Sequence, residues 1–168
     1  MNHIVMIGFM GSGKTRVGKR ISQDLGIPFV DVDKIIAKNM KMTRKEIYRR
    51  FGEPFYRALE TRAIKELIET EERFVVSVGA GLPAQEQNHK YLGQLGTIVY
   101  LKGSFAVLWK RMENSNSGEN QEKMKKLLEQ REPFYRRFAD ITVVTGVKPF
   151  EDLVKEVEEK LEKLEKNS

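Results

Sequence analysis

The sequence contains no cysteine and only two histidines, His3 and His89. Without cysteine the chain forms neither a disulfide bond nor a thiolate metal site. The two histidines are too isolated in the sequence to indicate a metal site of their own. The absence of cysteine is typical of a reducing compartment, so we expect a cytoplasmic protein.

Long hydrophobic runs are also absent. No apolar stretch approaches the roughly 20 residues that a membrane-spanning helix needs, so we expect no membrane partner. The first residues lack the charged start and the cleavage site of a signal peptide. An Asn-Lys-x-Asp sequence for guanine recognition is missing, which argues against a GTPase switch. With 168 residues, 40% hydrophobic and 32% charged, the composition predicts one globular domain.

The net charge of +6 favours anionic partners, either a nucleotide or a nucleic acid. A nucleic-acid surface would need clustered basic residues with aromatic residues between them. In this chain lysine and arginine are mixed with glutamate along the expected helices. We therefore expect a solvated surface of mixed charge and no nucleic-acid partner.

The strongest motif occupies residues 4–15. The apolar, β-branched run Ile4–Ile7 is typical of a buried strand, and residues 8–15, Gly-Phe-Met-Gly-Ser-Gly-Lys-Thr, match the phosphate-loop pattern without a mismatch. Glycines let backbone amides approach an anion closely, and the following helix adds its positive end. Lys14 would contact the β- and γ-phosphates, and Thr15 would bind Mg²⁺. A glycine-rich turn without a ligand is the weaker alternative, so the motif predicts nucleoside triphosphate binding.

Short apolar strands alternate with amphipathic helices along the rest of the chain. This alternation predicts an α/β fold in which helices cover both faces of a parallel sheet. The strands are expected at 4–7, 29–33, 74–78, 97–101 and 141–144. Helices are expected at 16–25, 34–51 (two helices, the second with a Thr43–Glu46 capping box), 55–69 (after an interruption at 52–54), 84–93, 105–113, 123–139 (with a kink or break at Pro133) and 150–166. Residues 114–120 are polar and rich in turn formers, which indicates a mobile loop.

Two aspartates follow the second expected strand. Ligands of such sheets lie beyond the carboxyl ends of the strands, and Asp31 and Asp33 would project on the same side if the strand continued that far. Beside a triphosphate, one carboxylate can hold Mg²⁺ while the other orients an acceptor hydroxyl and takes up its proton. A purely structural polar connection is the alternative, and the position one element after the phosphate loop weakens it.

Three further features belong to the same predicted site. Arg57 and Glu60 lie three residues apart on a helix, either as a surface ion pair or so that Glu60 holds the guanidinium for bidentate binding of a carboxylate. The sequence Gly79-Ala80-Gly81 follows a strand and allows close approach of a small polar ligand. Arg131 stands two residues before Pro133.

Together these residues resemble the shikimate kinase family, over nearly the whole chain. The resemblance is carried by five ordered motifs: the phosphate loop at 8–15, Asp-Val-Asp at 31–33, Gly-Glu-x-x-Tyr-Arg-x-x-Glu at 52–60, Gly-Ala-Gly at 79–81 and Arg-x-Pro-x-Tyr at 131–135. It implies a three-layer P-loop kinase fold with a five-stranded parallel sheet, in a single domain spanning 1–168 with a mobile lid at about 112–126. The implied reaction is ATP-dependent phosphorylation of the 3-hydroxyl of shikimate by a monomer, with Mg²⁺, on the pathway to chorismate and the aromatic amino acids.

The resemblance also implies roles for individual residues. Lys14 would stabilise charge on the transferring phosphoryl group, and Asp33 would contact the shikimate hydroxyls and accept the proton. Thr15 and Asp31 would serve Mg²⁺. The residues implied for ATP are Gly11, Ser12, Gly13, Lys14, Thr15 and Arg111, the last stacking on adenine, with the adenine loop at 145–149. The residues implied for shikimate are Asp33, Arg57, Gly79, Ala80, Gly81 and Arg131, with the two arginines gripping the carboxylate.

The chain departs from the family's pattern at three places. Ala80 replaces a glycine, and its Cβ either crowds the acceptor pocket or points away. Residues 112–126 lack the family's lid arginine and offer only Lys123, Lys125 and Lys126 instead. Because lysine lacks the planar fork of arginine, we expect low turnover if none of them replaces it. Tyr56 stands where phenylalanine is usual.

Two other functions remain open at this point. The first is a different small-molecule kinase on the same fold, of the gluconate or nucleoside-monophosphate type. The second is a noncatalytic nucleotide-binding regulator, which the missing lid arginine suggests. Asp33, Arg57 and Arg131 argue against a regulator, because a nucleotide sensor needs no acceptor pocket.

Overall fold

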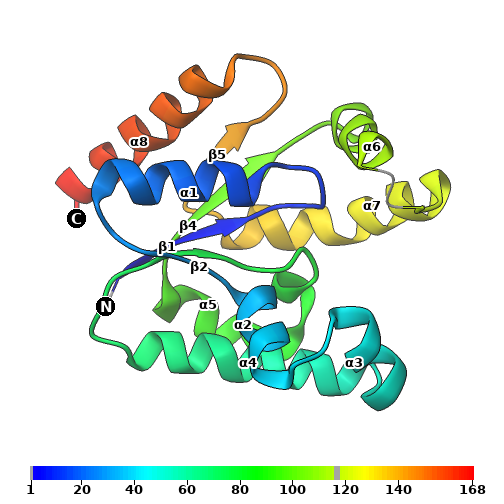
Figure 1. Cartoon of the computed structure of the whole chain (residues 1–168). Helices are drawn as coiled ribbons and strands as arrows, with labels where there is room; N and C mark the ends of the chain where they lie inside the picture. The colour runs from blue at the N-terminus through cyan, green and yellow to red at the C-terminus, as the bar shows by residue number, and fades with distance from the viewer. Residues whose placement is uncertain (1, 116–117) are drawn as a thin grey trace.

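The computed structural model describes residues 2–115 and 118–168. Its centre is a five-stranded sheet in the order β2-β3-β1-β4-β5 (Figure 1). All four strand pairs are parallel. The strands are β1 (His3–Ile7), β2 (Phe29–Asp31), β3 (Val75–Ser77), β4 (Gly96–Lys102) and β5 (Ile141–Val144). The predicted five-stranded parallel sheet is confirmed.

Eight α-helices are described around the sheet. They are α1 (Lys14–Leu25), α2 (Val32–Met40), α3 (Arg44–Phe51), α4 (Glu53–Glu69), α5 (His89–Leu95), α6 (Phe105–Asn114), α7 (Gln121–Phe138) and α8 (Phe150–Lys166). Figure 1 shows α1 and α8 on one side of the sheet and α4 and α5 on the other. Every residue of β1 is buried. Because helices cover both faces, this central strand is apolar from Ile4 to Ile7 instead of alternating.

One hydrophobic core lies on each face of the sheet, between the sheet and the helices that cover it. One core joins alternate β1 residues, such as Ile4, to Val17 of α1 and Val157 of α8. The other joins the opposite β1 side chains, such as Val5, to residues of α4, α5 and α7. No helix within the described ranges is both long enough and apolar enough to span a membrane.

The expected strand to residue 33 is wrong, because β2 ends at Asp31. Asp31 caps α2 instead: its carboxylate accepts hydrogen bonds from the backbone N–H groups of Asp33 (2.9 Å) and Lys34 (3.3 Å). These N–H groups belong to the first helical turn and have no partner inside the helix. A helical turn, and not strand alternation, therefore places Asp33 relative to Asp31.

Three other local expectations are settled by the structure. The helix predicted for 84–93 is wrong in its first half, which forms two 3₁₀ turns, η1 (Leu82–Ala84) and η2 (Glu86–Asn88), before α5. Helix α7 continues through Pro133, so of the kink or break predicted there the break is wrong. The Thr43 cap is confirmed, since its hydroxyl accepts a hydrogen bond from the Glu46 N–H at 3.2 Å. The predicted lid and loop include residues 116 and 117, which lie outside the described residues.

Candidate active site

The carboxyl ends of the central strands open on a crevice of about 860 Å³. Its walls come from the phosphate loop, the start of α2, one side of α3, the loop after β3, and α7. The residues lining it include Lys14, Thr15, Asp31, Asp33, Arg44, Tyr48, Gly79, Ala80, Lys123 and Arg131. Motifs spread over more than 100 residues of sequence thus meet in one crevice, as the sequence predicts.

The phosphate loop leaves the first turn of α1 open to an anion. Gly13 caps this helix in the left-handed region with φ 92°, and Gly11 has φ 81°, conformations that favour glycine. No side chain caps the free N–H groups, and no acidic residue occupies the first turn. Unpaired N–H groups and the positive end of the helix together favour a phosphate here.

Lys14 extends from this loop into the crevice. Its Nζ donates a hydrogen bond to the Gly8 carbonyl at 2.6 Å. Burial lowers the pKa of Lys14 to about 8, although the nearby carboxylates of Asp33 and Asp31 raise it. The positive charges of Arg131 and Arg44 lower it further. The side chains that line the crevice include more basic than acidic residues.

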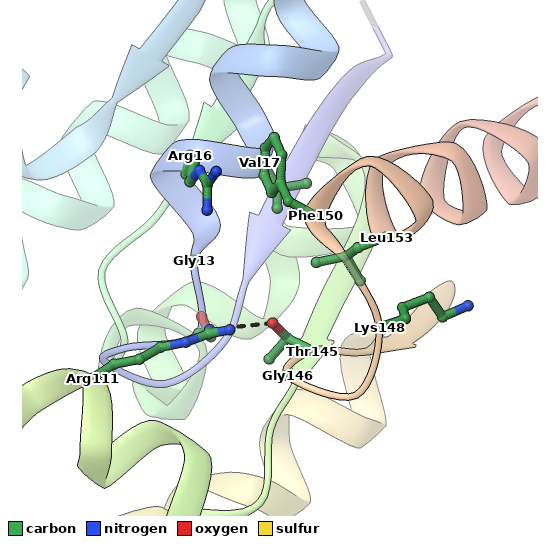
Figure 2. A pocket seen from close by; sticks show the side chains of 10 residues that line it. Gly13, Arg16, Val17, Arg111, Thr145, Gly146, Lys148, Phe150 and Leu153 are labelled. Atoms are coloured by element: carbon green, nitrogen blue, oxygen red, sulfur yellow. Dashed lines mark hydrogen bonds between the residues drawn. The ribbon is translucent and has the colours of Figure 1, made fainter.

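A second cavity, of about 270 Å³, lies on the other side of the phosphate loop (Figure 2). Ser12, Gly13, Arg111 and Thr145 contribute to its wall. Figure 2 shows the Arg111 side chain reaching Thr145, and its Nη1 donates to the Gly11 carbonyl (2.9 Å) and to the Thr145 hydroxyl (3.2 Å). The Ser12 hydroxyl is buried and has no hydrogen-bond partner among the described residues.

The opposite wall of this second cavity contains a residue pair that the sequence analysis missed. The guanidinium of Arg16 lies 3.8 Å from the centre of the Phe150 ring, and both residues line the cavity. The sequence signal for this pair was Arg16 itself, an arginine in the first turn of the helix that follows the phosphate loop. The cavity borders the phosphate loop at Ser12 and Gly13, and its wall combines an aromatic ring with two guanidinium groups.

Asp33 is held by a contact that we did not predict. The Tyr56 hydroxyl donates a short hydrogen bond to Asp33 Oδ1. Tyr56 is fully buried, and burial together with this hydrogen bond raises its pKa, so it stays a proton donor. Asp33 Oδ2 faces Gly79, where an added Cβ would lie 3.1 Å from it. The replacement of phenylalanine by tyrosine at position 56 was the sequence signal for this contact.

Arg57 and Glu60 form a buried pair, so the surface ion pair considered from the sequence is wrong. Arg57 Nη1 donates to Glu60 Oε1 at 2.7 Å, and the two side chains are 6% and 1% exposed. Glu53 adds a second carboxylate at 3.2 Å. Burial raises the pKa of Glu60, although the Arg57 charge opposes this shift. Arg57 is not among the residues that line the crevice.

The loop after β3 lies directly on this pair. A Cβ on Gly81 would lie 2.6 Å from Arg57 Nη2, closer than atoms can approach, so only glycine fits without displacing Arg57. The carbonyl of Ala80 accepts a hydrogen bond from the buried Tyr135 hydroxyl at 2.6 Å, which links this loop to α7. Ala80 is itself buried and lines the crevice.

The α7 side contributes two cations. Arg131 lines the crevice, with its guanidinium 6.0 Å from the centre of the Phe9 ring. Of the three lysines considered for the lid, Lys123 lines the crevice, whereas Lys125 and Lys126 do not. The structure therefore selects one of the three candidates by position.

The oxygen ligands in the crevice suit a hard cation. The described residues contain no cluster of three histidine, cysteine or acidic side chains that could hold a metal on its own. Asp31 uses one carboxylate oxygen to cap α2 and has a second, and Thr15 contributes a hydroxyl nearby. Mg²⁺ commonly binds through one or two carboxylates together with substrate phosphates, so this sparse set fits a Mg²⁺–triphosphate complex.

The buried pair gives a test of stability. Glu60→Ala would leave Arg57 buried with only the exposed Glu53 as a partner, and breaking a buried pair costs about 3 kcal/mol or more in the free energy of unfolding. Urea titration measures this loss. Glu66→Ala, which removes the exposed Arg62–Glu66 pair of the same helix, should cost less than about 1 kcal/mol. Equal losses in the two variants would contradict a structural role for Glu60.

Comparison with known proteins agrees with this geometry. The sequence model of the shikimate kinase family matches residues 10–162. A shikimate kinase of Thermodesulfovibrio yellowstonii is 39% identical over 168 residues, covering 94% of this chain and 96% of that protein. The crystal structure of shikimate kinase from Aquifex aeolicus is 36% identical, with a TM-score of 0.84 and 99% of both chains covered.

A further solved structure comes from a relative with a ligand. The shikimate kinase from Acinetobacter baumannii, in complex with shikimate, is 30% identical with a TM-score of 0.87, covering 96% of this chain and 93% of that one. The match to the family model includes residues 10–15 of the phosphate loop, both aspartates and both predicted arginines. From this coverage and identity, the chain belongs to the shikimate kinase family.

Proposed function

We propose that this chain transfers the γ-phosphoryl group of ATP to the 3-hydroxyl of shikimate. One observation carries the proposal: Lys14 and Thr15 of the phosphate loop line the same crevice as Asp33 and Arg131. Phosphoryl transfer depends mainly on positioning and on neutralising charge, and both requirements are met by residues of this crevice. Family membership and the shikimate bound to the Acinetobacter relative support the choice of acceptor.

On the nucleotide side, the free amides of residues 11–15 would bind the phosphates. Lys14 would stabilise the negative charge that develops on the transferring phosphoryl group. Arg111 would stack on adenine, in the cavity that also contains Ser12 and Gly13. Thr15 and Asp31 would hold Mg²⁺, which neutralises phosphate charge when bound.

On the acceptor side, Asp33 would orient the 3-hydroxyl and accept its proton. Its Oδ1 is occupied by Tyr56, so Oδ2, beside Gly79, is the oxygen left for the substrate. The backbone of Gly79, Ala80 and Gly81 would border the acceptor. Arg57 and Arg131 would bind the carboxylate of shikimate, as the family resemblance implies.

Three broader assignments accompany this proposal. Lys123 would supply the lid cation in place of the missing arginine, because it lines the crevice. Residues 1–168 would act as one domain with a lid at about 112–126, and as a monomer, since one chain supplies every residue invoked. A cytoplasmic enzyme remains our expectation from the lack of cysteine.

The direct test measures ADP formation with several acceptors. Shikimate should stimulate ADP formation strongly, whereas gluconate and AMP should not. Stimulation by gluconate or AMP alone would support the other kinase readings. Calorimetry covers the remaining alternative: nucleotide binding without any binding of shikimate would indicate a noncatalytic regulator.

Asp33→Asn should abolish most turnover while ATP binding is retained. The amide cannot take up the proton, and a general base contributes roughly 100-fold or more to the rate. Steady-state kinetics and nucleotide calorimetry measure the two effects. Asp152→Asn on the exposed surface of α8 is the isosteric control and should leave both unchanged. Near-normal turnover in Asp33→Asn would show that another group accepts the proton.

Tyr56→Phe should lower kcat by about tenfold and leave the KM for ATP unchanged. The ring keeps its packing, but Asp33 loses the hydrogen bond that fixes its orientation, and bonds to charged groups contribute about 1.5–3 kcal/mol. Tyr91→Phe, which removes a hydroxyl from α5, is the control. A Tyr56→Phe enzyme with full kcat would mean that the orientation of Asp33 does not depend on this bond.

Nucleotide binding should take up a proton at alkaline pH. In the free protein Lys14 has a pKa of about 8, so at about pH 9 it is mostly uncharged, while bound phosphates favour its charged form. Calorimetry in buffers of different ionisation enthalpy should show uptake at about pH 9 and much less at about pH 7. Lys14→Arg stays charged throughout and serves as the reference. The same uptake in both proteins would assign the proton to a different group.

A further inference from the structure

Arg44 is a crevice residue that the family motifs do not include. It begins α3, and its Nη2 donates a hydrogen bond to the Tyr48 hydroxyl at 3.1 Å. Its guanidinium lies 5.2 Å from the centre of the Tyr48 ring and 5.3 Å from that of Tyr56. The two rings pack edge to face, 5.2 Å apart. The two rings and the hydrogen bond thus fix the guanidinium in one place while Arg44 remains exposed.

Arg44, Arg131 and Arg57 differ in whether a carboxylate lies beside them. In the described part of the chain, no carboxylate oxygen lies within 4 Å of a guanidinium nitrogen of Arg44 or Arg131, which line the crevice together with Arg49. Arg57, which does not line the crevice, has two carboxylate partners, Glu60 and Glu53. Arg44 and Arg131 are therefore two cations of the crevice wall that have no carboxylate partner of their own.

These two guanidinium groups influence each other. Burial lowers the pKa of Arg131, and the neighbouring positive charges of Arg57 and Arg44 lower it further. The position of Arg44 is also unfavourable for its own helix, because a cation in the first turn opposes the helix dipole. Like charges gathered without counter-ions in a crevice are stabilised when an anion binds between them.

We propose that Arg44 is a further acceptor-binding residue, which joins Arg57 and Arg131 in binding the carboxylate of the acceptor. This inference rests on the proposed function and adds to it a residue that determines specificity. Arg44 lies on the ring of Tyr56, and the hydroxyl of that tyrosine contacts Asp33. An acceptor that presents its hydroxyl to Asp33 therefore has Arg44 beside it, so a small molecule carrying both a hydroxyl and a carboxylate meets both groups.

The position of Arg44 has a consequence for specificity. An acceptor without an anionic group would leave two arginines in the crevice without a counter-ion, and unpaired charges penalise the wrong ligand. Arg44 thus selects anionic acceptors over neutral polyols. Arginine suits this role better than lysine, because its planar fork binds a carboxylate in bidentate fashion while its face rests on the aromatic rings.

The test compares binding of two ligands to three proteins. Shikimate and its neutral carboxamide are titrated calorimetrically, in the presence of ADP, into the wild type, Arg44→Met and Arg50→Met. Arg50 is an exposed residue of the same helix that does not line the crevice. Arg44→Met should weaken shikimate binding by about 10- to 100-fold, the range for a hydrogen bond to a charged group. Its affinity for the carboxamide and for ADP should change less than about threefold, and Arg50→Met should resemble the wild type.

Each other outcome has a definite meaning. Equal weakening of shikimate and carboxamide would overturn the proposal, because the loss would then reflect the shape of the pocket. Loss of ADP affinity instead would place Arg44 on the phosphates, and an unchanged shikimate affinity would exclude it from the site. Arg44→Lys, which keeps the charge, should recover part of the affinity and covers the case in which Arg44→Met folds poorly. A wild type that does not bind shikimate would refute the proposed function itself.

Discussion

Excess positive charge at one edge of the sheet is the constraint on which the rest of the structure depends. Lys14, Arg44 and Arg131 meet at the crevice together with the open N-terminus of α1, and the acids that line it are Asp31, Asp33 and Glu119. Burial already lowers the pKa of Lys14 to about 8. Gathered positive charges lower the free energy of unfolding of the protein, and a triphosphate and an acidic acceptor neutralise them. The free energy lost in folding is therefore regained when these anions bind.

The surrounding scaffold keeps these charges apart and in place. Glu60 neutralises Arg57 beneath the loop after β3, and Gly81 leaves the space that this guanidinium occupies. Tyr135 fixes the carbonyl of Ala80 from α7. Arg111 links the phosphate loop to Thr145. The positions of the reacting groups therefore follow from buried polar contacts between elements that are far apart in sequence, and such contacts fix geometry because leaving them unmade is costly.

Local signals predicted most of the fold. Ile4–Ile7 predicted the central strand, the phosphate loop predicted the start of α1, and Thr43 predicted the start of α3. One error arose where a side-chain hydrogen bond competed with the expected pattern, at Asp31, which ends β2 by capping α2. Tyr56 stood out in the sequence, but its contact with Asp33 was not predicted, nor was that of Arg44 with two aromatic rings, because these contacts join α4, α3 and α2 across the tertiary structure. Sequence spacing describes neighbours within one element only.

Asp31 caps α2 and is also the proposed metal ligand, so the start of this helix and metal binding would depend on the same side chain. One oxygen of this carboxylate holds the first turn of α2, and that turn carries Asp33. A cation coordinated by the other carboxylate oxygen of Asp31 would pull on the side chain that sets where α2 begins. The orientation of Asp33, the proposed proton acceptor, would then respond to binding of the metal–nucleotide complex through Asp31 alone, without any movement of the sheet.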